Sequence, residues 1–272
     1  IFGRGLTIFI ILNLYLYFEE GINFYKNYKK VGKSGLVGGI GLGIARCMLE
    51  AGAEKVILVG RREDVLQEAC KKLGEKSSYL SQDIAKLDEI PSVAQKVVSD
   101  HGQPTCLVHN AGVTCKKPFL DLEDSEFMSV FDVHIRGALE ITKQFAPSMI
   151  ENSSGSILWI SSMATVMGLP LVTSYSMAKS AMHGAVYNLS AEFAPHGVRV
   201  NAILPGWIES AMALNSFKGD EPRRQKVLGR TPMGRMGKPE EVGHAAVFLC
   251  SDAASFVTGS LLTVDGGASI GF

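Results

Sequence analysis

Residues 34–41 read SGLVGGIG, and this stretch decides the fold that the sequence predicts. Its glycines at 35, 39 and 41 stand directly before an apolar run from Leu42 that is typical of a helix. Glycine in such a turn lets backbone amides approach a pyrophosphate at the positive end of the helix. We therefore expect Gly35, Gly39, Ile40 and Gly41 to bind a dinucleotide. A glycine-rich turn can also be a plain connection from strand to helix, so a second motif is needed.

From Gly35 onward, short β-branched runs alternate with longer helical stretches. This alternation predicts a single α/β domain in which helices flank a doubly wound parallel sheet. The expected strands are Val56–Val59, Cys106–Val108, Ile157–Ile160, Val198–Leu204 and Leu261–Val264. The expected helices are Leu42–Ala51, Glu63–Leu73, Ile90–Asp100, Asp124–Glu151, Ser174–Ala194 and Pro239–Leu249.

Arg61 and Arg62 follow the strand Val56–Val59, about twenty residues past the glycines, where a dinucleotide fold usually distinguishes its cofactors. An acidic residue there would bind the adenosine ribose of NAD. Two arginines instead favour a 2′-phosphate, and hence NADP(H) over NAD(H). Arginines after a strand are also often merely solvated.

Tyr175 and Lys179 lie four residues apart in an expected helix, so the phenol and the ammonium share one face. A nearby cation favours the phenolate, lowers the pKa of the tyrosine and makes it a usable acid and base near neutral pH. Taken alone, this pair is more often a packed tyrosine and a solvated lysine. Its position after the glycine turn and the strands makes it a candidate catalytic pair.

The composition excludes several classes of protein. With 272 residues, 46% of them hydrophobic, the chain can form one large domain with a sizeable core. Basic and acidic residues number 27 each, so no overall field attracts nucleic acid or an anionic membrane. The five cysteines show no C-x-x-C pair, which argues against a disulfide framework or a metal site. We expect a cytoplasmic protein with a small-molecule substrate, no nucleic-acid partner and no metal.

The N-terminal residues 1–30 are predicted to be an atypical extension, with the catalytic domain at 31–272. Leu6–Phe18 reads LTIFIILNLYLYF, which is too short for a typical spanning helix. Three interpretations stay open: a signal-type apolar segment, a membrane tether, and a non-native extension from a fragment or a misjoined gene. Membrane association is expected only for the tether.

The motifs along residues 31–272 resemble those of the short-chain dehydrogenase/reductase family, in the family's order. Besides the glycine turn they are Asp83-Ile84 after the third strand, Asn110-Ala111-Gly112, Ser162, Tyr175 with Lys179, Asn201, Pro205-Gly206 and Val264-Asp265-Gly266-Gly267. The resemblance implies an oxidoreductase with a Rossmann-type sheet of about seven strands flanked by helices. It also implies that the protein interconverts a secondary alcohol and a ketone, and that it assembles as a homotetramer or homodimer.

The resemblance implies a cofactor role for several motifs. Asp83 and Ile84 would bind near the adenine, and Asn110, Ala111 and Gly112 would line the cofactor cleft. After Pro205 and Gly206, Ile208 and Ser210 would hold the carboxamide of the nicotinamide.

The resemblance assigns the chemistry to three residues. Ser162 would hydrogen-bond the substrate oxygen, and Tyr175 would exchange the proton. Lys179 would hold the ribose hydroxyls and depress the pKa of Tyr175.

Two histidines depart from the family pattern. His134 stands where the family has an asparagine that supports a water in the proton relay, so we include it among the catalytic candidates and expect slower turnover or a shifted pH optimum. A histidine without a role is an equally good interpretation. His109 stands before Asn110 where a first asparagine is usual, and there we expect a modest loss of turn stability.

The first strand is the third departure. The residues that should lead into the glycine turn, 27–34, read NYKKVGKS, whereas a central parallel strand is buried on both faces and requires an apolar run. Either this segment forms a degraded strand, or the apolar residues upstream are drawn into the sheet.

Substrate choice is expected to depend on the loops Ala164–Ser174 and Trp207–Arg230, where Trp207, Met212, Leu214 and Phe217 could form an apolar lid. Our leading hypothesis is an NADP-dependent dehydrogenase or reductase. Alternatives in the same family are a 3-oxoacyl thioester reductase and a sugar-acid dehydrogenase. A non-catalytic nucleotide-binding protein and a membrane-tethered reductase are the alternatives from other classes.

Overall fold

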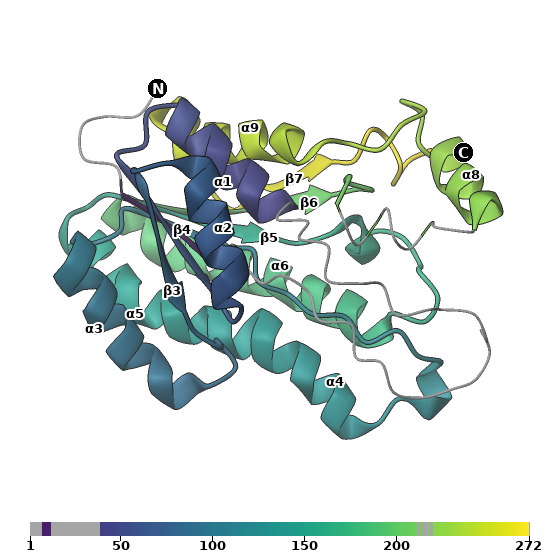
Figure 1. Ribbon diagram of the computed structural model, residues 1–272, viewed down its shortest axis with the longest axis horizontal. Coiled ribbons are helices and arrows are strands. Elements are labelled where there is room, and N and C mark those ends of the chain that lie inside the picture. Colours follow the sequence, from purple (N-terminus) through teal and green to yellow (C-terminus); the bar gives the residue numbers. More distant parts are fainter. Residues whose placement is uncertain (1–6, 12–38, 211–212, 214–216, 218–219, 272) are drawn as a thin grey trace.

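The computed structural model describes residues 7–11 and 39–271, apart from 211–212, 214–216 and 218–219 (Figure 1). Its strands form one parallel seven-stranded sheet in the order β3-β2-β1-β4-β5-β6-β7. The strands are Thr7–Ile11 (β1), Lys55–Gly60 (β2), Ser77–Ser81 (β3), Cys106–His109 (β4), Gly155–Ile160 (β5), Val198–Pro205 (β6) and Leu261–Val264 (β7). The predicted Rossmann-type sheet is confirmed.

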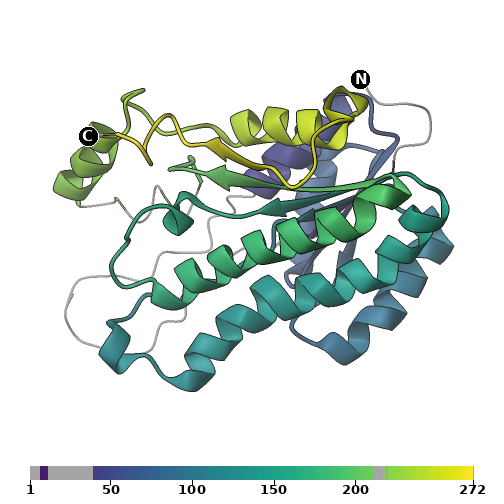
Figure 2. The ribbon, with the colours of Figure 1, turned by 180° about the vertical axis from the view of Figure 1, so that it is seen from behind.

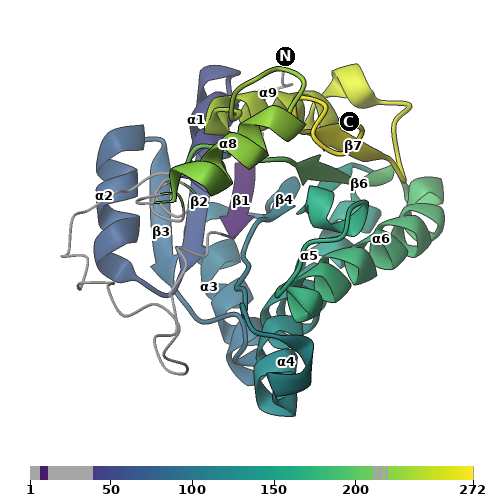
Figure 3. The same cartoon turned by 90° about the vertical axis from the view of Figure 1, so that its right-hand side faces the viewer.

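Helices cover both faces of the sheet, as a doubly wound fold requires (Figure 3). The helices are Ile40–Glu50 (α1), Glu63–Leu73 (α2), Ile90–His101 (α3), Asp124–Phe131 (α4), Ala138–Glu151 (α5), Thr173–Phe193 (α6), Glu221–Arg230 (α8) and Pro239–Cys250 (α9). The apolar side chains of α1, α2 and α9 form one core cluster with one face of the sheet. Those of α3, α5 and α6 form a second cluster with the other face.

The central strand β1 comes from the apolar segment near the N-terminus. Thr7–Ile11 pairs with β2 on one side and β4 on the other, and Ile8, Phe9 and Ile10 are at most 1% exposed. The structure thus favours the alternative in which the apolar residues upstream are drawn into the sheet. Thr7–Ile11 lies within residues 1–30, which were predicted to be an extension outside the catalytic domain. Residues 27–34 lie outside the described residues.

The helix predicted over 124–151 is interrupted. Between α4 and α5 the backbone widens into a π-helix over Asp132–Gly137 (η3). Gly137 passes so close to the carbonyl oxygen of Ile84 that a Cβ there would collide with it. The interruption places His134 on the inner side of the helix, where it is 1% exposed. Figure 2 shows the stretch from α4 to α5 running beside α6.

The polar helix α8 was not predicted, because its sequence EPRRQKVLGR contributes only Val227 to a buried surface. Within the described residues, no helix has both the length and the apolar character needed to cross a bilayer.

The placement of β1 is testable with Phe9→Ala. The Phe9 ring is buried 5.0 Å from the ring of Phe145, so its removal leaves a cavity in the centre of the core. We expect urea denaturation to show a loss of about 3–5 kcal/mol in the free energy of unfolding. Phe256→Ala is the matched control, because that ring is fully exposed and its loss should change stability by less than about 0.5 kcal/mol. Equal stability of the two variants would contradict this placement.

Candidate active site

The predicted site residues gather where the strands end. Asn110 follows β4, Ser162 lies two residues after β5, and Pro205 closes β6. Parallel strands share one carboxyl edge, which faces the viewer in Figure 3. Ligands of open α/β sheets bind outside this edge.

Ser162 and Tyr175 come together across the loop that joins β5 to α6. Ser162 caps a short 3₁₀ turn, where its hydroxyl accepts a hydrogen bond from the Ala164 amide at 3.1 Å. Tyr175 lies in the first turn of α6, where burial raises the pKa of its phenol and the neighbouring Ser162 side chain offsets part of the rise. The serine and the tyrosine thus lie close together at the carboxyl edge of the sheet.

Lys179 lies one helical turn after Tyr175 and is 3% exposed. Its Nζ donates a 2.6 Å hydrogen bond to the carbonyl oxygen of Ile160 and lies 5.6 Å from the centre of the Tyr175 ring. Burial lowers the pKa of Lys179 to about 7. This side chain therefore gains or loses a proton near neutral pH.

The prediction that Lys179 lowers the pKa of Tyr175 is not met in this structure. Burial raises the pKa of Tyr175, and the hydrogen bond with Ser162 offsets only part of the rise. The physical reason is that the same burial that surrounds the phenol also disfavours the charged form of Lys179. Only the charged form of a lysine stabilises a phenolate.

His134 lies between Tyr175 and the turn that follows β4. Its ring meets the Tyr175 ring edge to face, with centres 5.5 Å apart. Its Nε2 lies 3.0 Å from the amide nitrogen and 2.7 Å from the carbonyl oxygen of Val113. Burial and the charge of Lys179 hold the pKa of His134 well below its ordinary value. The imidazole is therefore neutral.

His109 is a packing residue. It is 2% exposed, its Nε2 lies 2.8 Å from Oγ1 of Thr142, and its ring packs against Trp159 at 4.5 Å. Burial lowers its pKa to about 3, so it carries no charge at neutral pH.

The glycine turn meets α1 at Gly39, whose φ of 144° is a conformation that favours glycine. Ile40 and Gly41 are the first residues of the helix, and Gly35 lies outside the described residues. At least the helix end of this turn therefore has the geometry that a pyrophosphate site requires.

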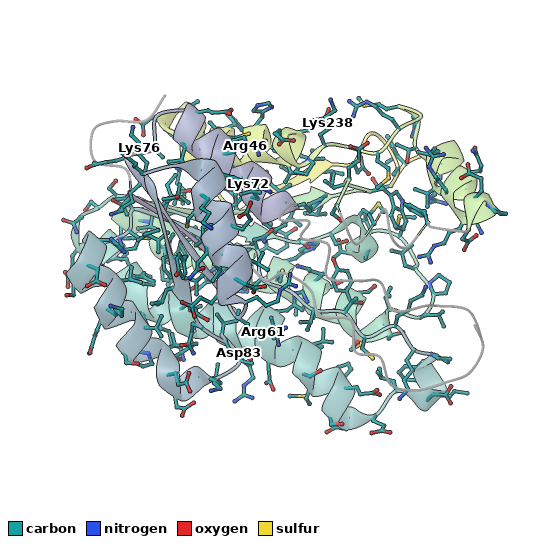
Figure 4. The ribbon with its side chains drawn as sticks, in the orientation of Figure 1. Arg46, Arg61, Lys72, Lys76, Asp83 and Lys238 are labelled. Atoms are coloured by element: carbon teal, nitrogen blue, oxygen red, sulfur yellow. The ribbon has the colours of Figure 1, made fainter. Side chains whose placement is uncertain are left out.

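Arg61 and Asp83 lie side by side at the ends of β2 and β3 (Figure 4). Nη1 of Arg61 is 3.8 Å from Oδ2 of Asp83, which is a long ion pair, and Oδ1 of Asp83 accepts from the Ala85 amide at 3.0 Å. Nε and Nη2 of Arg61, and Nε of Arg62, have no hydrogen-bond acceptor among the described residues. Three guanidinium nitrogens can thus donate to an anion such as a phosphate.

The segments 110–112 and 205–210 border the same edge. Ala111, Gly112 and Ile208 are buried, while Asn110 is partly exposed. Gly206 passes so close to Asp265 that a Cβ would lie 2.6 Å from its Cα. The Ser210 hydroxyl accepts from the Ala213 amide at 3.1 Å.

Asn201 on β6 instead holds the segment that leads into β7: its amide nitrogen donates to the Val257 carbonyl at 2.9 Å, and its oxygen accepts from the Ser260 amide at 3.0 Å. Trp207 packs against Phe217 at 6.1 Å, while Met212 and Leu214 of the predicted lid lie outside the described residues.

The sequence did not predict that the backbone of Val113 and the carbonyl oxygen of Ile160 belong to the site, because backbone groups give no signal in a sequence.

The described residues contain no group of three His, Cys, Asp or Glu side chains that could hold a metal ion. A glycine turn and a Ser-Tyr-Lys group at the carboxyl edge of one parallel sheet define a dinucleotide-dependent oxidoreductase.

Comparisons with known proteins agree with this class. A family model described as enoyl-(acyl carrier protein) reductase matches residues 35–269. The chain is 33% identical over 235 residues to 3-oxoacyl-[acyl-carrier-protein] reductase of Thermotoga maritima, covering 85% of this chain and 94% of that protein. It is 34% identical over 255 residues to galactitol 2-dehydrogenase of Rhizobium johnstonii, covering 90% and 98%.

A solved structure from Beutenbergia cavernae is similar over nearly the whole chain. That protein, assigned as an NAD(P)-dependent gluconate 5-dehydrogenase, contains NADP at low occupancy. It matches with a TM-score of 0.81 and 30% identity, covering 97% of this chain and 96% of its own. The chain belongs to the short-chain dehydrogenase/reductase family, as its motifs predicted. It is therefore an oxidoreductase of the class that acts on a CH–OH group or the corresponding carbonyl.

The pKa of Lys179 predicts how stability depends on pH. The unfolded chain keeps this lysine protonated up to about its ordinary pKa of 10.5, whereas the folded protein releases the proton near pH 7. The unfolded state binds more protons between these values, so stability rises with pH there. Relative to Lys179→Met, the free energy of unfolding should rise by about 3–5 kcal/mol from pH 7 to 10. Urea titrations of both proteins across this range check the difference, and parallel curves would contradict it.

Proposed function

We propose that this chain is an NADP(H)-dependent dehydrogenase or reductase that interconverts a secondary alcohol and a ketone at Ser162, Tyr175 and Lys179. The observation that carries the proposal is the arrangement around Tyr175. The Ser162 side chain lies near enough to its phenol to lower the pKa that burial raises, and the Tyr175 ring lies 5.6 Å from Nζ of Lys179. A hydroxyl, a proton donor and a titratable amine in one place are what carbonyl reduction requires.

When bound, the nicotinamide supplies or accepts the hydride. The Ser162 hydroxyl donates to the substrate oxygen and orients it. Tyr175 gives its proton to this oxygen in reduction and takes it back in oxidation. Lys179, with a pKa of about 7, is protonated in part at neutral pH and can return a proton toward Tyr175.

NADP(H) is the proposed cofactor, in preference to NAD(H). The Arg61 and Arg62 nitrogens without acceptors support this choice, because they follow β2, where a dinucleotide fold usually distinguishes a 2′-phosphate from a free ribose. We propose contacts from the turn at Gly35, Gly39, Ile40 and Gly41, and from the segments 83–84, 110–112 and 205–210. NADP in the Beutenbergia cavernae protein supports the choice.

The position of Lys116 supports the hypothesis that the substrate carries an anionic group. It lies in the loop after β4, beside Lys117, whose amide donates to the Leu171 carbonyl at 2.9 Å just before α6. Burial and then the charge of Arg223 lower the pKa of Lys116, whereas Asp220 raises it, so two cations and one carboxylate lie near this loop and leave a net positive charge. A sugar acid or a 3-oxoacyl thioester on a phosphorylated carrier would provide the negative charge.

Oligomeric state and location complete the proposal. We propose a homotetramer or homodimer, in keeping with the family, and a cytoplasmic location, in keeping with free thiols at all five cysteines.

Tyr175→Phe tests the chemistry. The variant keeps the ring but lacks the proton, so NADPH oxidation should fall at least about 100-fold while NADPH binding is kept. Initial rates should be measured against a 3-oxoacyl thioester, a keto sugar acid and a neutral ketose. Tyr187→Phe is the control, because that half-exposed ring lies farther along α6. Tight NADPH binding by the wild type without turnover of any substrate would instead support a non-catalytic nucleotide-binding protein.

Arg61→Gln tests the cofactor preference. Losing charged hydrogen bonds should weaken NADPH binding about 10- to 100-fold and leave NADH binding unchanged. Fluorescence titration with both cofactors measures the two dissociation constants. Arg46→Gln is the matched control, since Arg46 lies on α1 in an ion pair with Glu240 (Figure 4). An equal loss for both cofactors would contradict recognition of the 2′-phosphate by Arg61.

A further inference from the structure

A single nitrogen of the His134 imidazole meets both backbone polar groups of one residue, Val113. Its Nε2 lies 3.0 Å from the Val113 amide nitrogen and 2.7 Å from the Val113 carbonyl oxygen. Its other nitrogen, Nδ1, is buried and has no hydrogen-bond partner among the described residues. The ring as a whole is 1% exposed, so no solvent route replaces a missing bond.

One ring nitrogen cannot serve both of these groups. A neutral imidazole has one donor and one acceptor nitrogen. If Nε2 carries the proton, it donates to the Val113 carbonyl, and the Val113 N–H faces another N–H. If Nε2 is unprotonated, it accepts from the Val113 N–H, and its lone pair faces the carbonyl oxygen. In either tautomer the imidazole leaves one backbone group of Val113 without a hydrogen bond from it, which is costly in a partly buried place.

His134 also fills the space between the cofactor turn and the proton donor. A Cβ on Gly112 would collide with Cε1 of His134, so the ring lies against the backbone of the 110–113 turn. On its other side the ring meets Tyr175 edge to face at 5.5 Å. A shift of the imidazole therefore displaces the turn and the tyrosine together.

We propose that His134 is a positioning residue that couples the 110–113 turn to Tyr175. Because only Nε2 of its ring faces Val113, His134 holds this turn less firmly than a carboxamide side chain would. The inference rests on the proposed function, because it concerns the same site. A carboxamide has a donor and an acceptor side by side and can serve both groups of Val113. Glutamine places its amide where Nε2 lies now, and asparagine is one bond shorter.

The coupling does not require His134 to exchange a proton. Burial and the positive charge of Lys179 both disfavour the imidazolium, so the ring stays neutral at the pH of an ordinary assay. The coupling is therefore one of geometry. It changes how tightly the cofactor binds and how fast the enzyme turns over, without adding an ionisation to the pH profile.

The experiment compares His134→Gln and His134→Asn with the wild type, with NADPH as the titrated ligand. One more satisfied hydrogen bond should lower the dissociation constant about 5-fold and raise kcat, with KM for the carbonyl substrate less affected. His134→Leu fills similar space without hydrogen bonds and should weaken NADPH binding. His101→Asn is the control, because His101 lies at the end of α3, where its ring meets the Ser78 hydroxyl at 3.2 Å, and it should leave the dissociation constant unchanged.

Tighter NADPH binding in either carboxamide variant, with the pH profile of kcat/KM unchanged in shape, supports the proposal. Unchanged or weaker binding in both would overturn it, as would the loss of an ionisation from the pH profile, which would make His134 a proton carrier. Melting temperatures identify a variant that fails to fold. NADPH binding is measured without turnover. If the wild type binds NADPH but reduces no carbonyl, the proposed function is refuted, whereas the binding test of His134 remains valid.

Discussion

The structure depends on the burial of both faces of a parallel sheet. Strands β1, β2, β4, β5 and β6 have helices on either side, so their side chains are almost entirely apolar and enclosed. The carboxyl ends of parallel strands lie at one edge of the sheet. Polar side chains can lie at this edge without leaving a buried polar group unpaired. The concentration of Ser162 and Asn110 at that edge follows from this constraint. Lys179 is the exception, because it is itself buried and donates to a strand carbonyl.

Much of this could be predicted from the sequence, because the signals are local. A β-branched run bounded by polar residues predicted the strand Leu261–Val264, and apolar periodicity predicted the helix Glu63–Leu73. Both elements have the predicted bounds in the structure. Spacing on a helix placed Tyr175 and Lys179 on one face. The glycine turn and the arginines after β2 were also visible, because their function needs particular residue types at particular distances along the chain.

The rest depends on contacts between distant segments. No local signal could show that Thr7–Ile11, rather than residues next to the glycine turn, pairs with β2 and β4, because both sides of a central strand are supplied by other strands. The pKa directions of Tyr175 and Lys179 were equally hidden. Sequence spacing predicts that a cation is near a phenol, but burial decides how much charge the cation keeps, and burial belongs to the whole fold.

The π-helix at Asp132–Gly137 also sets the rotational phase of the polypeptide. A regular helix advances about 100° per residue, and a π-turn holds one residue more than an α-turn. The interruption therefore rotates α4 relative to α5 by about that angle, compared with one unbroken helix. The face that α4 turns toward α6 is thus decided by the number of residues in this segment as much as by their chemistry. A natural insertion or deletion here would turn a whole helix about its axis, so this helix tolerates exchanges of side chains more readily than changes of length.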